Sequence, residues 1–254
     1  MPLHSKFRPR GDDAGKSCAD INPTLILSTL IKEYGSPNWQ PRMGAVEELI
    51  FTVLTQHTSD SNAQIAYEQM RKSYPTWESV ISADTSQLVD VIRSGGLANQ
   101  KAPRIQIILS TILAKRGELN IDFLQSEDLP TAKSWLQQLP GVGPKTAAVV
   151  LAFAFGMPAM PVDTHVYRVA KRLGLIDETI TVEKAHDLLE QLIEPRDVYS
   201  LHVLLITHGR TMCKALRPMC NICPLRGPCP AKSILERGHL GKNVKRRTDT
   251  RSPY

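Results

Sequence analysis

The chain has 254 residues, of which 31 are Lys or Arg and 25 are Asp or Glu, so its formal net charge is +6. Because 42% of the residues are hydrophobic, the chain can bury a core, which excludes general disorder, and its length suits one or two domains. No apolar run approaches the ~20 residues of a membrane helix, and the first residues lack the apolar stretch of a signal peptide. We therefore expect a cytoplasmic protein with no membrane partner.

Helix signals follow one another along the central part of the chain. Asn22 is well placed to cap a helix that Pro23 opens and Gly35 ends. Further helices are expected at about 44–56 and 61–73, after the capping pair Asp84 and Gln87, around Ile105 to Leu109, and from near Pro130, Pro144, Thr164, Thr181 and Tyr199. No segment shows the alternation of apolar and polar residues that is typical of a strand. The sequence therefore predicts an all-α fold with short connections between helices.

Charge is distributed unevenly along the chain. Residues 1–20 carry a net charge of +1 and residues 232–254 one of +5, and because neither segment has a sustained apolar face, we interpret both as flexible tails. The body between them is neutral overall, but its segments differ in sign: −3 over 21–132, +4 over 133–172, −5 over 173–204 and +4 over 205–231. The two basic segments contain the motifs described next, which favours a polyanionic partner on the surface that they form.

Residues 135–156, WLQQLPGVGPKTAAVVLAFAFG, predict two helices joined by a tight loop. Pro144 opens the second helix after Gly141 and Gly143, whose small size lets backbone amides approach a neighbour closely. Such a loop at a helix start can hold a phosphate, although a glycine-containing turn can also simply join two packed helices. Lys145 lies in the first turn, where the positive helix end disfavours an ammonium ion and so favours a neutral, nucleophilic amine.

Asp163 precedes a second amphipathic helix in residues 161–174, PVDTHVYRVAKRLG, which Gly174 ends. An aspartate at this position is a good N-cap, and capping is the commoner role for such a residue. A carboxylate held at a helix start can also stabilise positive charge in a transition state. The two roles are compatible, so Asp163 is a second candidate functional residue.

Four cysteines gather near the end of the body with the spacing C-x6-C-x2-C-x5-C: Cys213, Cys220, Cys223 and Cys229. Two disulfides in so short a loop would be strained, so a four-thiolate metal site is the natural interpretation. The spacing alone fits tetrahedral zinc and an iron–sulfur cluster equally well. Four basic residues accompany the loop and favour a surface that faces phosphates: Arg210, Lys214, Arg217 and Arg226.

LPGVGPKTA at 139–147, VDTH at 162–165 and the cysteine spacing together resemble the endonuclease III family of helix-hairpin-helix DNA glycosylases. The similarity covers about residues 22–231. The resemblance implies two helical lobes with the active site in the cleft between them. One lobe would be a six-helix barrel over 41–157 that bears the helix-hairpin-helix. The other would join 21–40 to 158–231 and carry a [4Fe–4S] cluster on the four cysteines.

The resemblance also implies roles for the candidate residues. Hairpin residues Gly141, Val142 and Gly143 would bind the DNA backbone, Lys145 would attack C1′ of a damaged nucleotide, and Asp163 would assist. The implied activity is base excision through a Schiff base, followed by β-elimination that nicks the strand. The expected partner is double-stranded DNA with oxidised pyrimidines or abasic sites, bound by a monomer.

Two loops resemble those with which the family fills the gap left by an extruded nucleotide. In GGLANQKA at 95–102, Leu97 is similar to the leucine that enters the base stack, with Asn99 and Lys101 beside it. In VLTQHTSD at 53–60, the family's usual glutamine position is His57, preceded by Gln56. On the residues alone, a core leucine and a solvent-facing histidine would serve as well, and the departure at His57 leaves the lesion preference open.

Three alternative functions share parts of this motif set. Adenine-mismatch glycosylases of the superfamily use a glutamate at the position of Thr52 and lack the lysine, which disfavours that assignment here. A monofunctional glycosylase for mismatched or deaminated bases, uracil or thymine, would release a base without cutting the strand. A non-catalytic DNA-binding member is a third possibility, against which the presence of both Lys145 and Asp163 argues.

Overall fold

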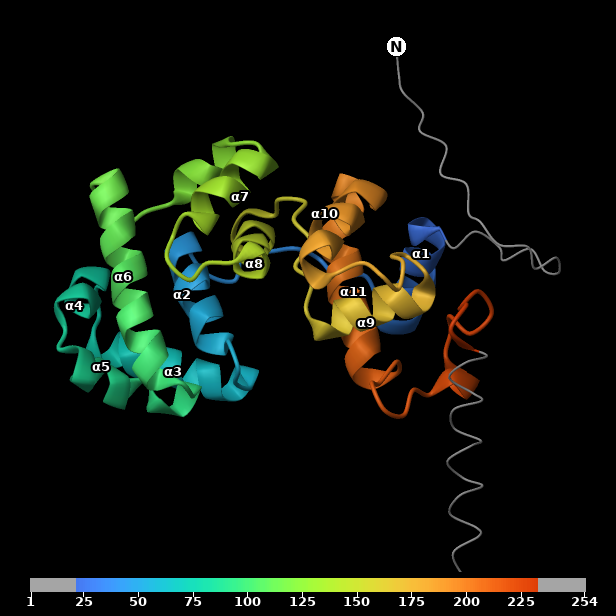
Figure 1. Ribbon diagram of the computed structural model, residues 1–254, viewed down its shortest axis with the longest axis horizontal. Helices are drawn as coiled ribbons and strands as arrows, with labels where there is room; N and C mark the ends of the chain where they lie inside the picture. The colour runs from blue at the N-terminus through green and yellow to red at the C-terminus, as the bar shows by residue number, and fades with distance from the viewer. Residues whose placement is uncertain (1–21, 233–254) are drawn as a thin grey trace, which may run out of the picture.

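The computed structural model describes residues 22–232, and within that range the chain forms helices and no strand (Figure 1). The α-helices are α1 (Pro23–Tyr34), α2 (Ala45–Thr55), α3 (Asp60–Ser73), α4 (Trp77–Ser82), α5 (Thr85–Val91), α6 (Ala98–Arg116), α7 (Leu129–Gln137), α8 (Pro144–Phe155), α9 (Thr164–Leu173), α10 (Val182–Leu192) and α11 (Val198–Thr211). Short 3-10 helices lie at Arg93–Gly95, Asp122–Ser126, Pro195–Asp197 and Cys220–Ile222, the first three between α-helices and the last after α11. The prediction of an all-α fold is confirmed. Except for Lys232, the two predicted tails lie outside the described residues.

Local capping chemistry explains where several helices begin. The Asn22 side chain accepts a hydrogen bond of 2.8 Å from the Thr24 amide, and Pro23 occupies the first position of α1. The Asp84 carboxylate accepts bonds from the Ser86 and Gln87 amides at the start of α5. The six-residue helix α4 was not predicted. Six residues are too few to show a periodic apolar pattern, which explains why this helix was not recognised in the sequence.

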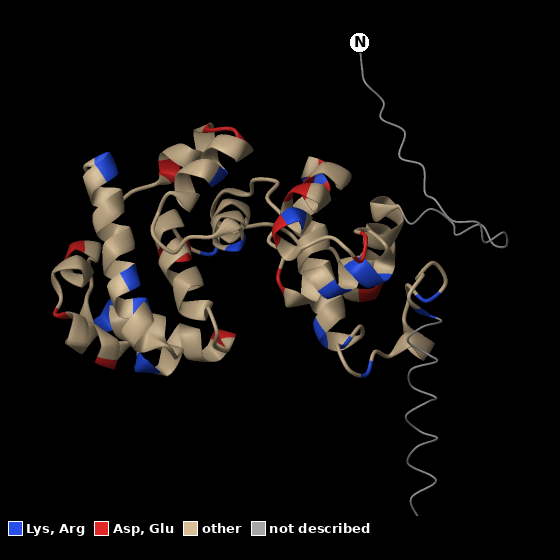
Figure 2. Ribbon diagram, viewed as in Figure 1, with Lys and Arg blue, Asp and Glu red and all other residues tan. Residues whose placement is uncertain are grey.

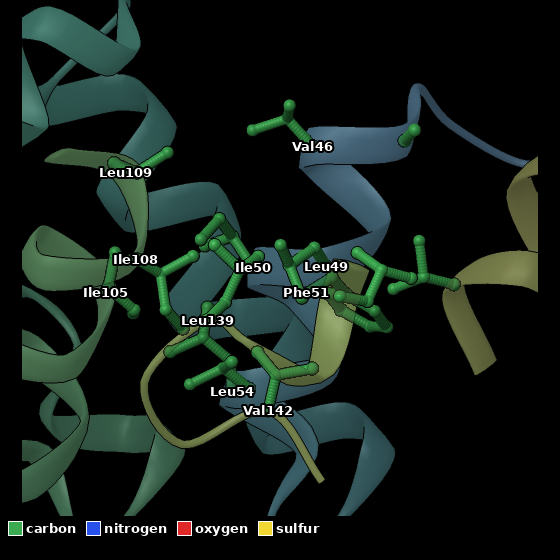
Figure 3. Packing of buried hydrophobic residues seen from close by; sticks show 14 of the residues in the cluster. Val46, Leu49, Ile50, Phe51, Leu54, Ile105, Ile108, Leu109, Leu139 and Val142 are labelled. Carbon is green, nitrogen blue, oxygen red and sulfur yellow. The ribbon is translucent and has the colours of Figure 1, made fainter. Parts of the chain in front are cut away.

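The buried apolar residues form two separate clusters. The first contains residues of all the helices from α2 through α8. Figure 3 shows Leu139 and Val142 of the hairpin within it, among side chains of α2 and α6. The second joins α1 to α9, α10 and α11, so the first and last helices of the chain share one core. We propose that these clusters are the cores of two lobes with the predicted bounds, 41–157 for one and 21–40 with 158–231 for the other. No helix of residues 22–232 is long and apolar enough to span a membrane.

The segment between α1 and α2 crosses from the second cluster to the first and is fixed by polar contacts. Trp39 Nε1 donates a hydrogen bond of 2.8 Å to the Ala152 carbonyl of α8. Arg42 donates two bonds, of 2.6 and 2.5 Å, to the carboxylate of Glu48, which is fully buried in α2. The Arg42 guanidinium also lies 5.1 Å from the ring centres of Phe51 and Phe153. One arginine therefore neutralises a buried charge and packs α2 against α8.

Replacing Arg42 by Met should lower the free energy of unfolding by about 3 kcal/mol, because it leaves the buried Glu48 carboxylate without its partner. The matched control is Arg93→Met, since Arg93 pairs with Asp90 at the surface, where such pairs contribute about 0–1 kcal/mol. Chemical denaturation of the three proteins measures both effects. Equal losses for the two variants would contradict this account of the Arg42 pair.

Candidate functional site

The predicted hairpin is present between α7 and α8. Gly141 has φ +78°, and a Cβ built on it would lie 2.7 Å from Cδ of Arg104, so both the backbone conformation and the space require glycine there. Gly143 is exposed, and a Cβ on it would meet nothing within 4 Å. Val142 lies differently from these two glycines, because its side chain is buried in the first cluster and its amide donates to the Leu139 carbonyl at 3.1 Å. The hairpin thus presents two glycines to solvent and is anchored by the valine between them.

Lys145 lies in the first turn of α8 with its side chain exposed. The residues that follow it, from Thr146 to Ala148, are buried, so the charged Lys145 side chain lies at the end of a helix whose next residues are enclosed by protein. Because the N-cap residue, Gly143, has no side chain, no side-chain cap occupies the start of the helix. Lys145 is therefore accessible to a ligand that approaches the start of α8.

Asp163 caps α9, as the sequence predicts. Its Oδ1 accepts hydrogen bonds from the amides of His165 at 2.8 Å and Val166 at 2.7 Å, and the residue is half-buried. Both of these bonds engage the same oxygen, so neither occupies Oδ2. The cap consequently fixes the orientation of a carboxylate that retains an oxygen for another partner.

His202 of α11 is a buried histidine whose pKa depends on the charges of both Lys145 and Asp163. Its imidazole is buried, with its ring centre 5.7 Å from that of Phe153 on α8, and burial lowers its pKa to about 4. The charge of Asp163 raises this pKa, whereas the charge of Lys145 lowers it. The charges of both candidate residues therefore act on the same buried imidazole, which is neutral at pH 7. Lys145 and Asp163 as the catalytic pair stay a prediction.

The two predicted DNA-reading loops carry the expected exposed side chains. His57 and Leu97 are both exposed, and they are the only residues other than glycine within 22–232 that have positive φ, at 54° and 50°. Asn99 is exposed in the first turn of α6. Gln56 lies inward, where its Nε2 donates to Thr146 Oγ1 at 3.3 Å and its Oε1 accepts from Arg104 at 3.1 Å. Gln56 therefore connects the end of α2 to the residue that follows Lys145.

Lys101 is placed differently from the other predicted DNA contacts. Its side chain is only 1% exposed, and its Nζ donates to the carbonyls of Leu54 and Gly95, both at 2.7 Å. Because the ammonium is enclosed by protein, it does not reach a phosphate in this arrangement. The expectation of a direct DNA contact for Lys101 is therefore corrected to a role inside the protein.

The four cysteines line one cavity below α9 and α11, together with Arg172 and His208. Arg172 Nη1 lies 3.4 Å from Cys213 Sγ, and His208 Nε2 lies 3.6 Å from Cys223 Sγ. Burial, together with the neighbouring cysteines, raises the pKa of the Cys223 thiol to about 11. Within the described residues, no three His, Cys, Asp or Glu side chains are close enough to hold a single metal ion. The four thiols thus line one shared cavity.

Basic and acidic side chains are segregated around these features (Figure 2). Lysines and arginines gather on α9, at the end of α11 and on the cysteine loop, whereas acids are concentrated on α10. Arg168 of α9 donates to the Gly209 carbonyl near the end of α11, and Arg172 donates to the Lys214 carbonyl at the start of the cysteine loop, both at 2.8 Å. The helix that Asp163 caps therefore also holds the cysteine loop in place.

Stability should decrease as the pH falls from about 6.5 toward 4. The pKa of His202 is lower in the folded protein than in the unfolded chain, so the unfolded chain binds the proton more tightly across this range. The slope from one such group reaches about 1.4 kcal/mol per pH unit. His202→Phe should show a smaller decrease in its unfolding temperature between pH 7 and pH 5 than the wild type, as measured by circular dichroism. Parallel pH profiles for the two proteins would contradict this.

Comparison with known proteins identifies the family. A family model described as "HhH-GPD superfamily base excision DNA repair protein" matches residues 50–195. The chain is 35% identical to endonuclease III of Rickettsia prowazekii, over 80% of this chain and 94% of that protein. It also matches a non-covalent endonuclease III–DNA complex, with TM-score 0.71, 32% identity, and 84% and 96% of the two chains covered. A trapped endonuclease III–DNA covalent intermediate matches with TM-score 0.71, 31% identity, and 85% and 99% covered. The chain therefore belongs to the HhH-GPD superfamily of base excision DNA repair proteins.

Proposed function

We propose that this protein is a DNA glycosylase with abasic-site lyase activity, which acts as a monomer on oxidised pyrimidines and abasic sites in duplex DNA. The observation that carries the proposal is an exposed Lys145 in the first turn of α8 together with an Asp163 carboxylate that two backbone amides orient. The similarity to a solved covalent endonuclease III–DNA intermediate over nearly the whole folded chain supports a covalent mechanism.

The chemistry follows from these two side chains. The neutral amine of Lys145 attacks C1′ of the damaged nucleotide, and the bond between C1′ and the base breaks, so the base leaves with the bonding electrons and acquires a proton. Positive charge develops on the sugar during this step. Asp163 stabilises that charge, because its carboxylate is already oriented by the amides of His165 and Val166. The lysine nitrogen then gives up a proton, the C1′–O4′ bond of the sugar ring breaks and O4′ takes up a proton, which leaves a Schiff base between Lys145 and C1′. This Schiff base acidifies the protons on C2′, and loss of one of them expels the 3′ phosphate and nicks the strand.

DNA would be held by the start of α8 and by the basic surface beside it. The exposed glycines Gly141 and Gly143 allow a phosphate to approach the backbone at the positive end of the helix. The basic residues of α9 and of the cysteine loop extend this attraction along the strand. His57, Leu97 and Asn99 lie at the exposed tips of two neighbouring loops and would occupy the space vacated by an extruded nucleotide.

The four cysteines would hold a [4Fe–4S] cluster. Four thiolates suit both tetrahedral zinc and an iron–sulfur cluster, and the resemblance of the cysteine spacing to that of the endonuclease III family favours the cluster. Such a group would tie together the loop from Cys213 to Cys229. Arg172 and His208, which already contact Cys213 and Cys223, would hydrogen-bond to the ligated sulfurs.

A thymine-glycol duplex incubated with the wild-type protein and borohydride should give a covalent protein–DNA adduct, and Lys145→Ala should abolish it. Asp163→Asn should lower the rate of base release by roughly 100-fold, since asparagine preserves the cap but removes the charge. The matched control is Asp128→Asn, which changes the corresponding cap of α7, where the Asp128 carboxylate accepts from the Thr131 amide.

An adduct formed by Lys145→Ala would overturn the assignment of the nucleophile. Release of the base without a strand break, seen on a gel run without alkaline treatment, would instead indicate the monofunctional alternative. Stable lesion binding without turnover would indicate a non-catalytic protein. Equal losses for Asp163→Asn and Asp128→Asn would show that Asp163 serves only as a cap.

Purified protein should be brown and contain about four iron and four sulfide per chain, as a [4Fe–4S] cluster requires. Cys220→Ser should lower the iron content, because it removes one of the four ligands. Metal analysis and visible absorbance provide the readout. A colourless preparation with one zinc per chain would contradict the cluster assignment.

A further inference from the structure

The loops that carry His57 and Leu97 lie against one another. A Cβ built on Gly96 would be 3.9 Å from the His57 carbonyl oxygen and 3.9 Å from Thr58 Cβ, which places the two loop backbones in contact range. His57 and Leu97 both adopt left-handed backbone conformations, which side-chain-bearing residues adopt only where the surrounding structure holds them. The exposed tips of these loops are therefore a fixed feature, and something in the protein must maintain it.

Lys101 is the residue placed to do this. Its ammonium bridges the Leu54 carbonyl in the last turn of α2 and the Gly95 carbonyl of the 3-10 helix, at 2.7 Å each. Leu54 comes two residues before Gln56, and Gly95 comes two residues before Leu97. The last carbonyls of a helix lack helical partners and carry partial negative charge, so a cation satisfies them well. One side chain thus joins the backbones that lead into both loops.

Burial makes this contact a strong constraint. Lys101 is 1% exposed and pairs with no carboxylate within residues 22–232, so its charge is compensated there by the two carbonyl groups and not by an acid. If the ammonium were removed, both carbonyls would lose a buried donor. An apolar residue at this position could not donate hydrogen bonds to the Leu54 and Gly95 carbonyls.

We propose that Lys101 is a positioning residue that clamps His57 and Leu97 into one preformed wedge, which fills the gap left when a nucleotide is extruded from duplex DNA. This inference rests on the proposed glycosylase function. A wedge lowers the cost of extrusion only where a base stack has to be opened. An abasic site in single-stranded DNA needs no such opening, so its cleavage requires the chemistry at Lys145 but not the clamp.

The test compares two substrates with the full-length holoprotein under single-turnover conditions: a thymine-glycol duplex and a single-stranded oligonucleotide with one abasic site. The central variant is Lys101→Met, which keeps the chain length and removes the charge. Leu97→Ala is the reference for loss of the wedge. Lys72→Met, at an exposed lysine of α3, is the matched control. Circular dichroism establishes the temperature at which every variant is folded.

Lys101→Met should lower the duplex rate by roughly 10- to 100-fold while changing the single-strand rate by less than about threefold, and Leu97→Ala should show the same split. Lys72→Met should match the wild type on both substrates. If Lys101→Met does not fold, Lys101→Gln replaces it, because an amide can donate to one of the two carbonyls and should give an intermediate split.

Equal losses on both substrates would show that Lys101 merely stabilises the fold, and no loss on either would show that the loops do not need it. Both results overturn the clamp while leaving the proposed function intact. If the wild type cleaves neither substrate, the proposed function itself fails and the clamp fails with it.

Discussion

The burial of α8 is the constraint on which the candidate site depends. The helix runs through the first apolar cluster and is held near its far end by Trp39, which donates to the Ala152 carbonyl, and by Arg42, which lies over Phe153. Because the body of the helix cannot shift without exposing apolar surface, its first turn is fixed in space. Lys145 therefore projects from an anchored helix start, and the glycines of the hairpin are held beside it.

The second cluster holds α9, the helix that Asp163 caps. Asp163 is oriented by the helix that it caps, and the same helix supplies the arginines that hold the cysteine loop. His202 lies where α11 meets α8, so its buried imidazole links the first cluster with the second. In this arrangement the reactive groups belong to different cores, and the packing between the cores sets their relative position.

Local sequence patterns predicted much of this structure, and long-range contacts account for what they did not predict. Capping residues such as Asn22 and Asp163, and the glycine and proline punctuation of the hairpin, act on their own neighbours and so can be recognised in the sequence. The buried position of Lys101 could not be predicted, because it depends on two carbonyls, one of which lies 47 residues away. The same holds for His202, which looks like any polar residue in an apolar helix until α8 and α9 are placed against it. The Gln56–Thr146 contact likewise joins residues 90 positions apart.

The most direct test of the central claim is to locate the covalent bond. Wild-type protein is trapped on an abasic duplex with borohydride, the adduct is digested, and the modified peptide is sequenced by mass spectrometry. The account predicts that the sugar remnant is attached to Lys145, in the peptide that begins the buried helix α8. Attachment to another amine, such as that of the exposed Lys115, would contradict the account even if the protein cleaved DNA.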